Sequence, residues 1–274
     1  GRGRFCAGLG ASCVDGGQSA STRGDLLPPP LVSELARLQD RVAPFPYAEV
    51  RAAIERELGR PLESVYRSFA TELVAAASVS QVHRAVLADG GTEEAVKVRR
   101  PDIERLVTLD RAILVFLAST LARIVPSLRL VSLADAMEHF CEAVAEQLRF
   151  DREAENNARF TDNFRDDPDV SFPRVYPEAS SNGVLTMEFI GGVHESEIER
   201  SGVDPQRIAA AGMRCVCRMI FLHGFVHADL HPGNLRFFPP GRIVLLDLGL
   251  VGSLTTEDRR SAAELLFAFA TGDG

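Results

Sequence analysis

The stretch that decides the fold is Phe225 to Gly252, FVHADLHPGNLRFFPPGRIVLLDLGLVG. It begins with polar and turn-forming residues, as a loop does, and a turn is predicted at Pro239-Pro240-Gly241. An apolar run from Ile243 to Leu246 follows, and such a run is typical of a short buried strand. The run ends in Asp247-Leu248-Gly249. The stretch therefore predicts a polar loop, a turn, and a strand that ends in an aspartate.

The polar residues of this stretch have the spacing of a phosphotransfer site. Asp229 and Asn234 are five residues apart, and Asp247 lies thirteen residues after Asn234. This order matches the catalytic loop H-R-D-x-x-x-x-N and the metal-binding D-F-G of phosphotransferases. Phosphoryl transfer from ATP needs one carboxylate near the acceptor hydroxyl, together with an amide oxygen and a second carboxylate that hold magnesium. The sequence contains all three groups in the required order.

Composition narrows the class of protein. The chain has 274 residues, enough for one large domain or two lobes, and a formal net charge of −8 at pH 7. The negative charge argues against a nucleic-acid backbone as the main partner. Of the 30 basic residues only one, Lys97, is a lysine, and it lies in the apolar segment Ala95–Val98. An arginine would serve equally well on a solvated strand edge, so we interpret Lys97 as a functional residue.

The cysteines bear on the cellular compartment of the protein, and the ends of the chain bear on whether it is a piece of a longer protein. Five cysteines are present, an odd number without the C-x-x-C spacing of a zinc site: Cys6, Cys13, Cys141, Cys215 and Cys217. We expect buried thiols in a reducing intracellular compartment. No segment has the pattern of a signal peptide, and the apolar run 112–118 is too short to span a bilayer. The chain does not begin with methionine and stops after a helical pattern, so we expect a piece of a longer protein.

The N-terminal half predicts helices followed by a small sheet. Residues 1–24 are glycine- and serine-rich, as in a flexible arm, and residues 31–38 and 47–58 have helical periodicity. Strands are predicted over 68–74, 81–87 and 94–98. The turn between the first two strands consists of small residues that let backbone amides approach a phosphate: Ala75, Ala76, Ala77 and Ser78.

Outside Phe225–Gly252, the second half of the sequence is predicted to be mostly helical. Helical patterns cover 102–124, 133–164 and 205–223, and a strand is predicted over 183–189 with glycines at its end. The amphipathic segment 31–38 could contact a membrane surface, although core packing is the simpler interpretation.

Six motifs follow one another along the chain. They are Gly17-Gln18 with S-T-R-x-D-L-L-P, AAASVSQVHRA (75–85), AVKVRRP (95–101), REAENNARF (152–160), HADLHPGN and LLDLG. Together they resemble the UbiB family of atypical protein-kinase-like proteins, over about residues 17–266. The resemblance implies an α+β, bilobal protein-kinase-like fold. It also implies a family-specific extension over residues 1–66, an N-lobe with inserted helices over 67–190, and a partial C-lobe over 191–274.

The resemblance also implies roles for individual residues. Lys97 would neutralise the α and β phosphates of ATP and be held by Glu153. Asp229 would stand where a kinase has its catalytic base, and Asn234 and Asp247 would hold Mg²⁺. Arginine would serve poorly at position 97, because its broad planar group replaces a compact ammonium.

The remaining roles concern the nucleotide and the partners. Ala75 to Ser78 would form the nucleotide loop, the backbone of Glu188 and Ile190 would take the adenine edge, and Met187 would lie behind it. Members of the family associate with membranes and act in isoprenoid-quinone metabolism, so the resemblance implies a membrane surface or an isoprenoid lipid as a partner.

Two motifs depart from the family pattern. The family's K-x-G-Q has Asp15 in place of the lysine, and its E-x-D reads Gln147-Leu148-Arg149 here. In the family these groups meet over the nucleotide and restrain protein phosphorylation. Because the charges are inverted here, we hypothesise that Asp15 pairs with Arg149.

Three other functions stay open at this point. The chain could be a nucleotide-binding pseudokinase that acts as a scaffold, because the two altered motifs lie near the expected nucleotide site. It could present a lipid or a protein without catalysing a reaction. A metal hydrolase is the third, because His223, His227 and His231 are spaced four residues apart, but Ala228 occupies the position of the glutamate in H-E-x-x-H and Pro232 interrupts a helix.

Overall fold

The computed structural model describes residues 44–77, 79–124, 138, 141–142 and 144–271. The chain divides into two compact units. Unit 1 contains residues up to Asp151 together with Tyr176–Thr186, and unit 2 contains Arg152–Val175 and Met187–Gly274. The predicted helix over 31–38 and the residue Asp15 lie outside the described residues. The three lobe boundaries predicted from the resemblance stay a prediction.

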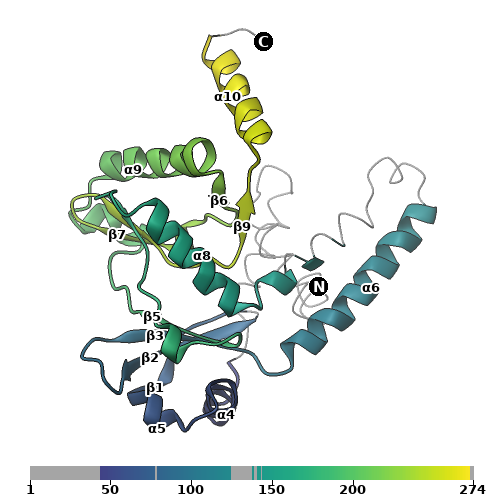
Figure 1. Cartoon of the computed structure of the whole chain (residues 1–274), viewed down its shortest axis with the longest axis vertical. Helices are drawn as coiled ribbons and strands as arrows, with labels where there is room; N and C mark the ends of the chain where they lie inside the picture. Colours follow the sequence, from purple (N-terminus) through teal and green to yellow (C-terminus); the bar gives the residue numbers. More distant parts are fainter. Residues whose placement is uncertain (1–43, 78, 125–137, 139–140, 143, 272–274) are drawn as a thin grey trace. The chain divides into compact units, whose positions relative to one another are not determined.

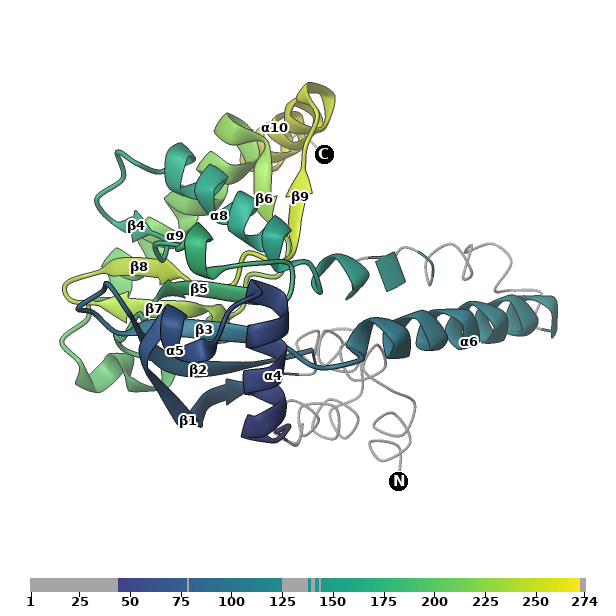
Figure 2. The ribbon, with the colours of Figure 1, turned by 60° about the horizontal axis from the view of Figure 1, so that its bottom comes forward.

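Unit 1 is built on a four-stranded sheet in the order β1-β2-β3-β5 (Figure 2). Its strands are β1 (Tyr66–Ala76), β2 (Ser80–Leu87), β3 (Glu94–Arg99) and β5 (Val184–Glu188). The first three strands form an antiparallel meander, as the alternation of the sequence predicts. β1 shifts register between Phe69 and Ala75, so the edge strand is irregular just before the small-residue turn.

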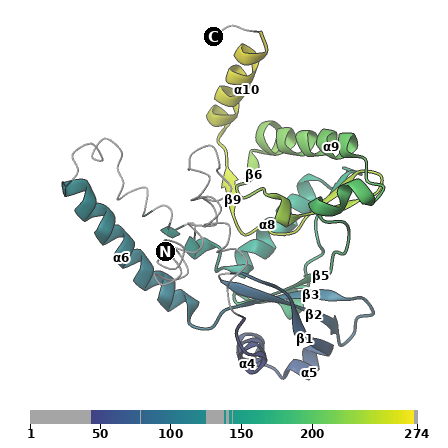
Figure 3. The same ribbon diagram turned by 180° about the vertical axis from the view of Figure 1, so that it is seen from behind.

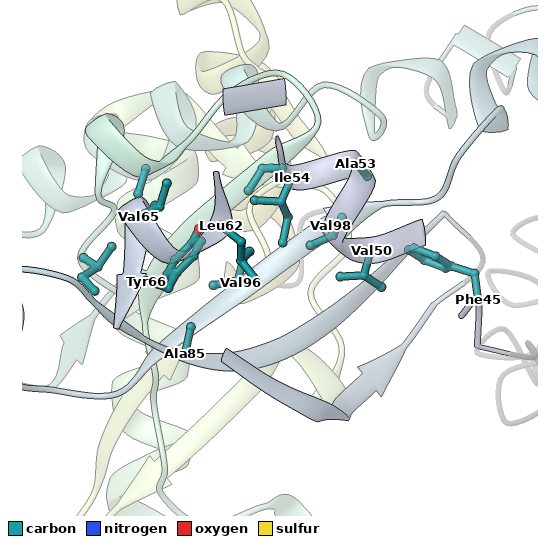
Figure 4. Packing of buried hydrophobic residues seen from close by; sticks show 13 residues of the cluster. Phe45, Val50, Ala53, Ile54, Leu62, Val65, Tyr66, Ala85, Val96 and Val98 are labelled. Atoms are coloured by element: carbon teal, nitrogen blue, oxygen red, sulfur yellow. The ribbon is translucent and has the colours of Figure 1, made fainter. Parts of the chain in front are cut away.

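Two helices cover one side of this sheet (Figure 3). α4 (Tyr47–Leu58) begins after Pro46 and ends at Gly59, whose left-handed φ of 66° suits glycine. The short α5 (Leu62–Val65) follows. Figure 4 shows Val50 and Ile54 of α4 packed toward Val96 and Val98 of β3, and all four side chains are fully buried. The predicted helix over 47–58 is therefore confirmed.

The helical part of unit 1 differs from the sequence prediction in one place. α6 (Ile103–Ile124) forms as expected and extends away from the sheet (Figure 2). The single helix predicted over 133–164 is wrong in its described part, because residues 147–149 are not helical and α8 (Phe150–Asn163) begins after them. The Phe150 amide donates to Asn182 O at 3.1 Å, and Arg99 Nη1 donates to Leu148 O at 2.9 Å. These contacts with distant segments replace the helical hydrogen bonds.

Unit 2 contains two small sheets and the helices that cover them (Figure 1). One sheet has the order β4-β8-β7, formed by β4 (Val170–Ser171), β8 (Arg242–Leu245) and β7 (Leu235–Phe238). The other pairs β6 (Phe225–His227) with β9 (Val251–Ser253). The 3-10 segments η2 (Pro177–Ala179), η3 (Glu195–Arg200) and η5 (Pro232–Asn234) complete the connections, η2 lying in unit 1.

The helices of unit 2 pack on an aromatic core. Phe160 of α8 is fully buried, and its ring centroid lies 4.7 Å from that of Phe225 and 5.4 Å from that of Phe172. α9 (Pro205–Cys217) adds further apolar residues to the same core. The predicted helix over 205–223 is confirmed up to residue 217, and its last turn widens into the π-helix η4 (Arg218–His223).

The C-terminal helix α10 (Thr256–Thr271) completes unit 2. It contains no buried residue, and several of its large apolar side chains are exposed: Leu265, Leu266, Phe267 and Phe269. Within the described parts of the chain, no helix is both long enough and apolar enough to cross a bilayer.

Candidate active site

Lys97 lies in the middle of a regular strand. It is paired with Val82 across the β2–β3 ladder and is only 8% exposed. Its neighbours Val96 and Val98 point into the core under α4, so the alternation of the strand places Lys97 on the opposite face. There its ammonium nitrogen lies 5.0 Å from the centroid of the Phe150 ring. The register of the sheet thus places the single lysine of the chain, nearly buried, on the face opposite the core under α4.

The small-residue turn closes the hairpin that precedes this strand. Ala75 and Ala76 end β1, opposite Val82 and Gln81, and the Ala77 amide donates to Ser80 O at 2.8 Å. Ser78 lies outside the described residues. Of the predicted nucleotide loop, Ala75 and Ala76 therefore belong to β1, and Ala77 directly follows this strand.

The predicted catalytic loop begins at β6 in unit 2 (Figure 1). His227 pairs with Val251 of β9, and the Ala228 amide donates to Leu250 O at 3.0 Å. This short ladder fixes the start of the loop against the segment that follows Asp247-Leu248-Gly249. Two residues later the side chain of Asp229 is 47% exposed, so its carboxylate is accessible to a reactant.

The two histidines of the loop brace its backbone. His227 Nδ1 accepts a hydrogen bond from the Asp229 amide at 3.1 Å, and His231 Nδ1 accepts one from the Gly233 amide at 3.1 Å. Burial lowers the pKa of His227, although the nearby carboxylate of Asp247 opposes this effect. A neutral imidazole is consistent with its role as an acceptor at Nδ1.

Backbone hydrogen bonds bring Asn234 and Asp247 to neighbouring positions. Leu235 and Leu245 are partners in the β7–β8 ladder, and the Leu246 amide donates to Asn234 O at 2.9 Å. Asp247 is the next residue along the chain. The Asn234 side-chain Nδ2 donates to Asp229 O at 3.3 Å, and Asp247 Oδ1 accepts from the Gly249 backbone amide at 3.0 Å. The twelve residues between them in sequence contain the β7–β8 hairpin.

Helix α8 supports the Asp247-Leu248-Gly249 segment from behind. Asn156 Nδ2 donates to Leu248 O at 2.9 Å. Glu153, one turn earlier on α8, is 2% exposed. A Cβ atom placed on Gly249 would lie 3.2 Å from Asp247 Oδ1 and 3.6 Å from Glu153 Oε2, so these side chains surround the glycine.

The contact of Asn156 is the one that the sequence patterns did not assign. Its three-residue separation from Glu153 places the two on one helix face, which is the signal that could have suggested it. Lys97 belongs to unit 1 and Glu153 to the part of the chain in unit 2, so their ion pair stays a prediction.

The segment expected to take the adenine edge lies at the end of β5. The Glu188 amide donates to Arg174 O at 2.7 Å, and Glu188 Oε2 accepts from the Arg174 amide at 3.3 Å. Met187, the residue expected behind the adenine, is 9% exposed. Because the Glu188 amide is engaged, an adenine contact at this residue would use its carbonyl. Ile190 is half-buried and lies just after the strand.

The candidate metal ligands Asn234 and Asp247 suit Mg²⁺ better than a metal ion that is bound by protein ligands alone. In the described part of the chain, no three His, Cys, Asp or Glu side chains are grouped to hold a metal ion. His223, His227 and His231 lie on η4, on β6 and in the following loop, so the metal-hydrolase alternative is not supported. Mg²⁺ is commonly bound by one or two carboxylates, water and substrate phosphates. Asn234 and Asp247 fit that pattern.

Arg149, in the altered E-x-D motif, has a charged partner two residues along the chain. Arg149 Nη2 lies 2.7 Å from Asp151 Oδ2, and Arg149 Nε donates to Asp151 Oδ1 at 3.4 Å. Asp15 lies outside the described residues, so its pairing with Arg149 stays a prediction.

Comparison with known protein families identifies the family of this chain. A model of the ABC1 atypical kinase-like domain matches residues 37–274. The chain belongs to the ABC1 family. The resemblance to UbiB proteins and the kinase-like α+β fold are thereby confirmed. Membership of a kinase-like family also implies ATP binding.

Two curated relatives of this ABC1 chain illustrate the similarity. The probable protein kinase UbiB of Sodalis glossinidius (strain morsitans) is 37% identical over 272 residues, which are 97% of this chain and 50% of the relative. The protein ACTIVITY OF BC1 COMPLEX KINASE 3, chloroplastic, of Arabidopsis thaliana is 38% identical over 262 residues, 94% of this chain and 37% of the relative. The chain thus spans about half the length, or less, of these relatives.

A solved structure shares the ABC1 fold. Rv3197 of Mycobacterium tuberculosis, determined as a complex with erythromycin, matches with a TM-score of 0.60 and 30% sequence identity. The match covers 77% of this chain and 53% of that chain.

Proposed function

We propose that this ABC1 chain binds ATP and catalyses magnesium-dependent phosphoryl transfer or ATP hydrolysis. The observation that carries the proposal is the hydrogen bond from the Leu246 amide to Asn234 O, because it brings the catalytic loop beside the strand that ends in Asp247. A phosphotransferase needs an amide oxygen and a carboxylate side by side to hold the metal. The family match supports the same function.

In this proposal each residue of unit 2 has a separate task. Asp229 accepts the proton of the attacking hydroxyl or water, and its exposed carboxylate suits this task. Asn234 and Asp247 hold Mg²⁺, which neutralises charge on the phosphates when it is bound. His227 holds the Asp229 backbone, and Asn156 holds the Leu248 carbonyl, so both act by positioning other groups.

The remaining residues bind the nucleotide in this proposal. Lys97 neutralises the α and β phosphates, and Glu153 orients its ammonium. The hairpin tip at Ala75 to Ser78 covers the phosphates, with fewer close backbone approaches than a glycine loop allows, because a Cβ penalises positive φ. The adenine edge meets the backbone of Glu188 and Ile190.

The two motifs that depart from the family pattern, K-x-G-Q and E-x-D, favour one alternative. This alternative is a nucleotide-binding pseudokinase that acts as a lipid or protein scaffold. Gln147 and Arg149 stand where the family has acids, and Arg149 is occupied by Asp151. A link to isoprenoid-quinone metabolism and to a membrane surface belongs to this proposal too, and rests on the UbiB resemblance.

Measuring ADP release from Mg-ATP separates the two functions. Asp247→Asn keeps the shape of the side chain but removes its charge, so we expect turnover to fall about 10²- to 10³-fold. The matched control is Asp162→Asn, an exposed aspartate on α8 that pairs with Arg165, which should leave the rate unchanged. A rate indifferent to Asp247→Asn contradicts catalysis at this site. Stabilisation by Mg-ATP without any ADP release indicates the pseudokinase.

A further inference from the structure

Unit 2 contains a cavity that the proposed phosphotransfer does not use. Its volume is about 380 Å³. It is bounded by α9, by the turn between β7 and β8, and by the loop that leads into β4. None of the predicted catalytic, metal or nucleotide residues lines it.

The lining of this cavity carries an excess of positive charge. Arg207 and Arg214 come from α9 and Arg242 begins β8, whereas Asp169 is the only acidic residue among the described lining side chains. The formal charge of the described lining is therefore three positive and one negative. The whole chain has a net charge of −8, so this local sign is opposite to that of the molecule.

Hydrogen bonds to the backbone hold the walls in place. The Ile243 amide donates to Asp169 O at 2.7 Å, which ties the loop before β4 to β8. The Asp204 amide donates to Pro240 O at 2.8 Å, which ties the start of α9 to the turn. A Cβ atom on Gly241 would lie 2.5 Å from Arg207 Cβ, so only glycine lets the turn approach α9 this closely.

The three arginines retain donors for a ligand. Arg214 is hydrogen-bonded to Asp169. Arg207 Nε lies 3.8 Å from Asp204 Oδ2, beyond hydrogen-bond distance. The Arg242 guanidinium lies over the Phe238 ring, 4.4 Å from its centroid, and this contact uses the face of the group and not its N–H donors. A guanidinium has five N–H donors, so each arginine can bind an anion as well.

We propose that this cavity binds a phosphomonoester. A phosphate ester carries about −1.5 to −2 charges at neutral pH, which balances the excess of two positive charges in the lining. Its three terminal oxygens accept the parallel hydrogen bonds that arginine donates. A volume near 380 Å³ lies within the range of small-molecule sites, and Ala210 and Pro239 offer apolar surface to the organic part of the ester. The proposal does not depend on phosphotransfer at Asp229.

The test is isothermal titration calorimetry of the chain with phenyl phosphate, repeated with inorganic phosphate. Arg207→Gln and Arg242→Gln each remove donors from exposed side chains, so the fold should survive, and circular dichroism checks this. We expect each change to weaken binding by about tenfold or more, because a hydrogen bond to a charged group is lost. Added salt should also weaken binding.

Two control variants separate this cavity from other sites. Arg260→Gln changes an exposed arginine of α10 and should leave binding unchanged. Lys97→Ala removes the lysine proposed for the nucleotide site, and phenyl phosphate should bind this variant as well as the parent chain. Binding that is lost in Lys97→Ala but kept in Arg207→Gln overturns the proposal.

A second arm distinguishes a soluble ester from a lipid headgroup. It measures cosedimentation with phosphatidylcholine vesicles that contain phosphatidic acid. Arginine-dependent binding to these vesicles, without binding of phenyl phosphate, keeps the phosphomonoester and assigns it to a lipid. The proposal is overturned if neither probe binds, or if binding is indifferent to Arg207→Gln and Arg242→Gln. Binding of only a glutamate-rich peptide also overturns it, because the cavity would then dock acidic protein segments.

Discussion

Lys97 and Asp229 stand on two different kinds of backbone. Lys97 is part of a continuous antiparallel ladder, and its direction follows from the alternation of one strand. Asp229 lies in a loop between short strands, and single hydrogen bonds to the distant residues Leu250 and Leu246 hold this loop at Ala228 and Asn234. We refer to these as the strand region, β1 to β3, and the loop region, Phe225–Gly252.

The two regions hold their candidate functional residues in position by different kinds of contacts. In the strand region, several neighbouring backbone hydrogen bonds of the ladder hold Lys97 in position. The loss of one side-chain contact should therefore move Lys97 little. The loop region relies on the packing of α8 behind it and on a few specific bonds, among them Asn156 to Leu248. We therefore expect distant substitutions to disturb the loop region more than the strand region.

The largest effect is expected from Phe160→Ala, which removes the packing behind the loop region. The side chain is fully buried between Phe172 and Phe225, so its loss should lower the free energy of unfolding by about 3–5 kcal/mol. Urea denaturation followed by circular dichroism measures this. The control is Phe269→Ala, an 88% exposed phenylalanine, which should change stability by less than about 0.5 kcal/mol. Equal effects of the two changes would contradict the packing of α8.

The next effect is expected from Lys97→Arg, which tests the chemistry of the strand region without breaking its ladder. Mg-ATP at a hundredfold its dissociation constant should stabilise the parent chain by about 2.7 kcal/mol. The variant should lose this stabilisation, because a planar guanidinium does not replace the nearly buried ammonium. Thermal unfolding with and without Mg-ATP is the measurement.

Its matched control is Arg84→Lys, the reverse exchange at an exposed position of β2. This variant should keep the full Mg-ATP shift. An unchanged shift in Lys97→Arg would remove Lys97 from the nucleotide site.

A smaller effect is expected from Asn156→Ala, which removes one specific bond of the loop region. Without the donor to Leu248 O, the free energy of unfolding should fall by about 1 kcal/mol. ADP release should fall as well, because the bond holds the segment that contains Asp247. Glu155→Ala, an exposed neighbour on α8, is the control for both readouts. If the two variants release ADP equally fast, α8 does not position Asp247 through this bond.

The smallest effect concerns pH and His83 of the strand region. Burial lowers the pKa of His83 below its usual 6.5, so the unfolded chain binds a proton more readily than the folded chain. Stability contributed by the neutral form is therefore present above pH 6.5 and is lost as pH falls below it. His83→Leu should reduce this loss, measured as the change in unfolding free energy between pH 7 and pH 5. An identical slope in the variant would contradict the pKa shift.

Elements made by local contacts were predictable from the sequence. α4 matches its prediction over 47–58 because Pro46, the buried face of Val50 and Ile54, and Gly59 are all local signals. The same holds for the meander of β1, β2 and β3, whose alternation and turns are short-range. Lys97 was recognised because it is the single lysine of the chain.

Features that depend on distant segments were not predictable in this way. The predicted long helix breaks before Phe150 because the Phe150 amide bonds to Asn182, more than thirty residues further along the chain. The last turn of the helix that begins at Pro205 widens before Gly224, which the periodicity of the sequence did not indicate. The contact of Asn156 with Leu248 was missed for the same reason, because it joins residues 92 positions apart.

The sequence by itself determined which groups are available for chemistry in Phe225–Gly252 and in what order they occur, because motif spacing is a local property of the chain. It also placed the chain among kinase-like proteins. Only the tertiary structure decided that Asn234 and Asp247 become neighbours and that α8 supports them. It also gathered the arginines of α9 and β8 around one cavity. These features arise from hydrogen bonds and packing between segments far apart in sequence, where no local pattern specifies the partner.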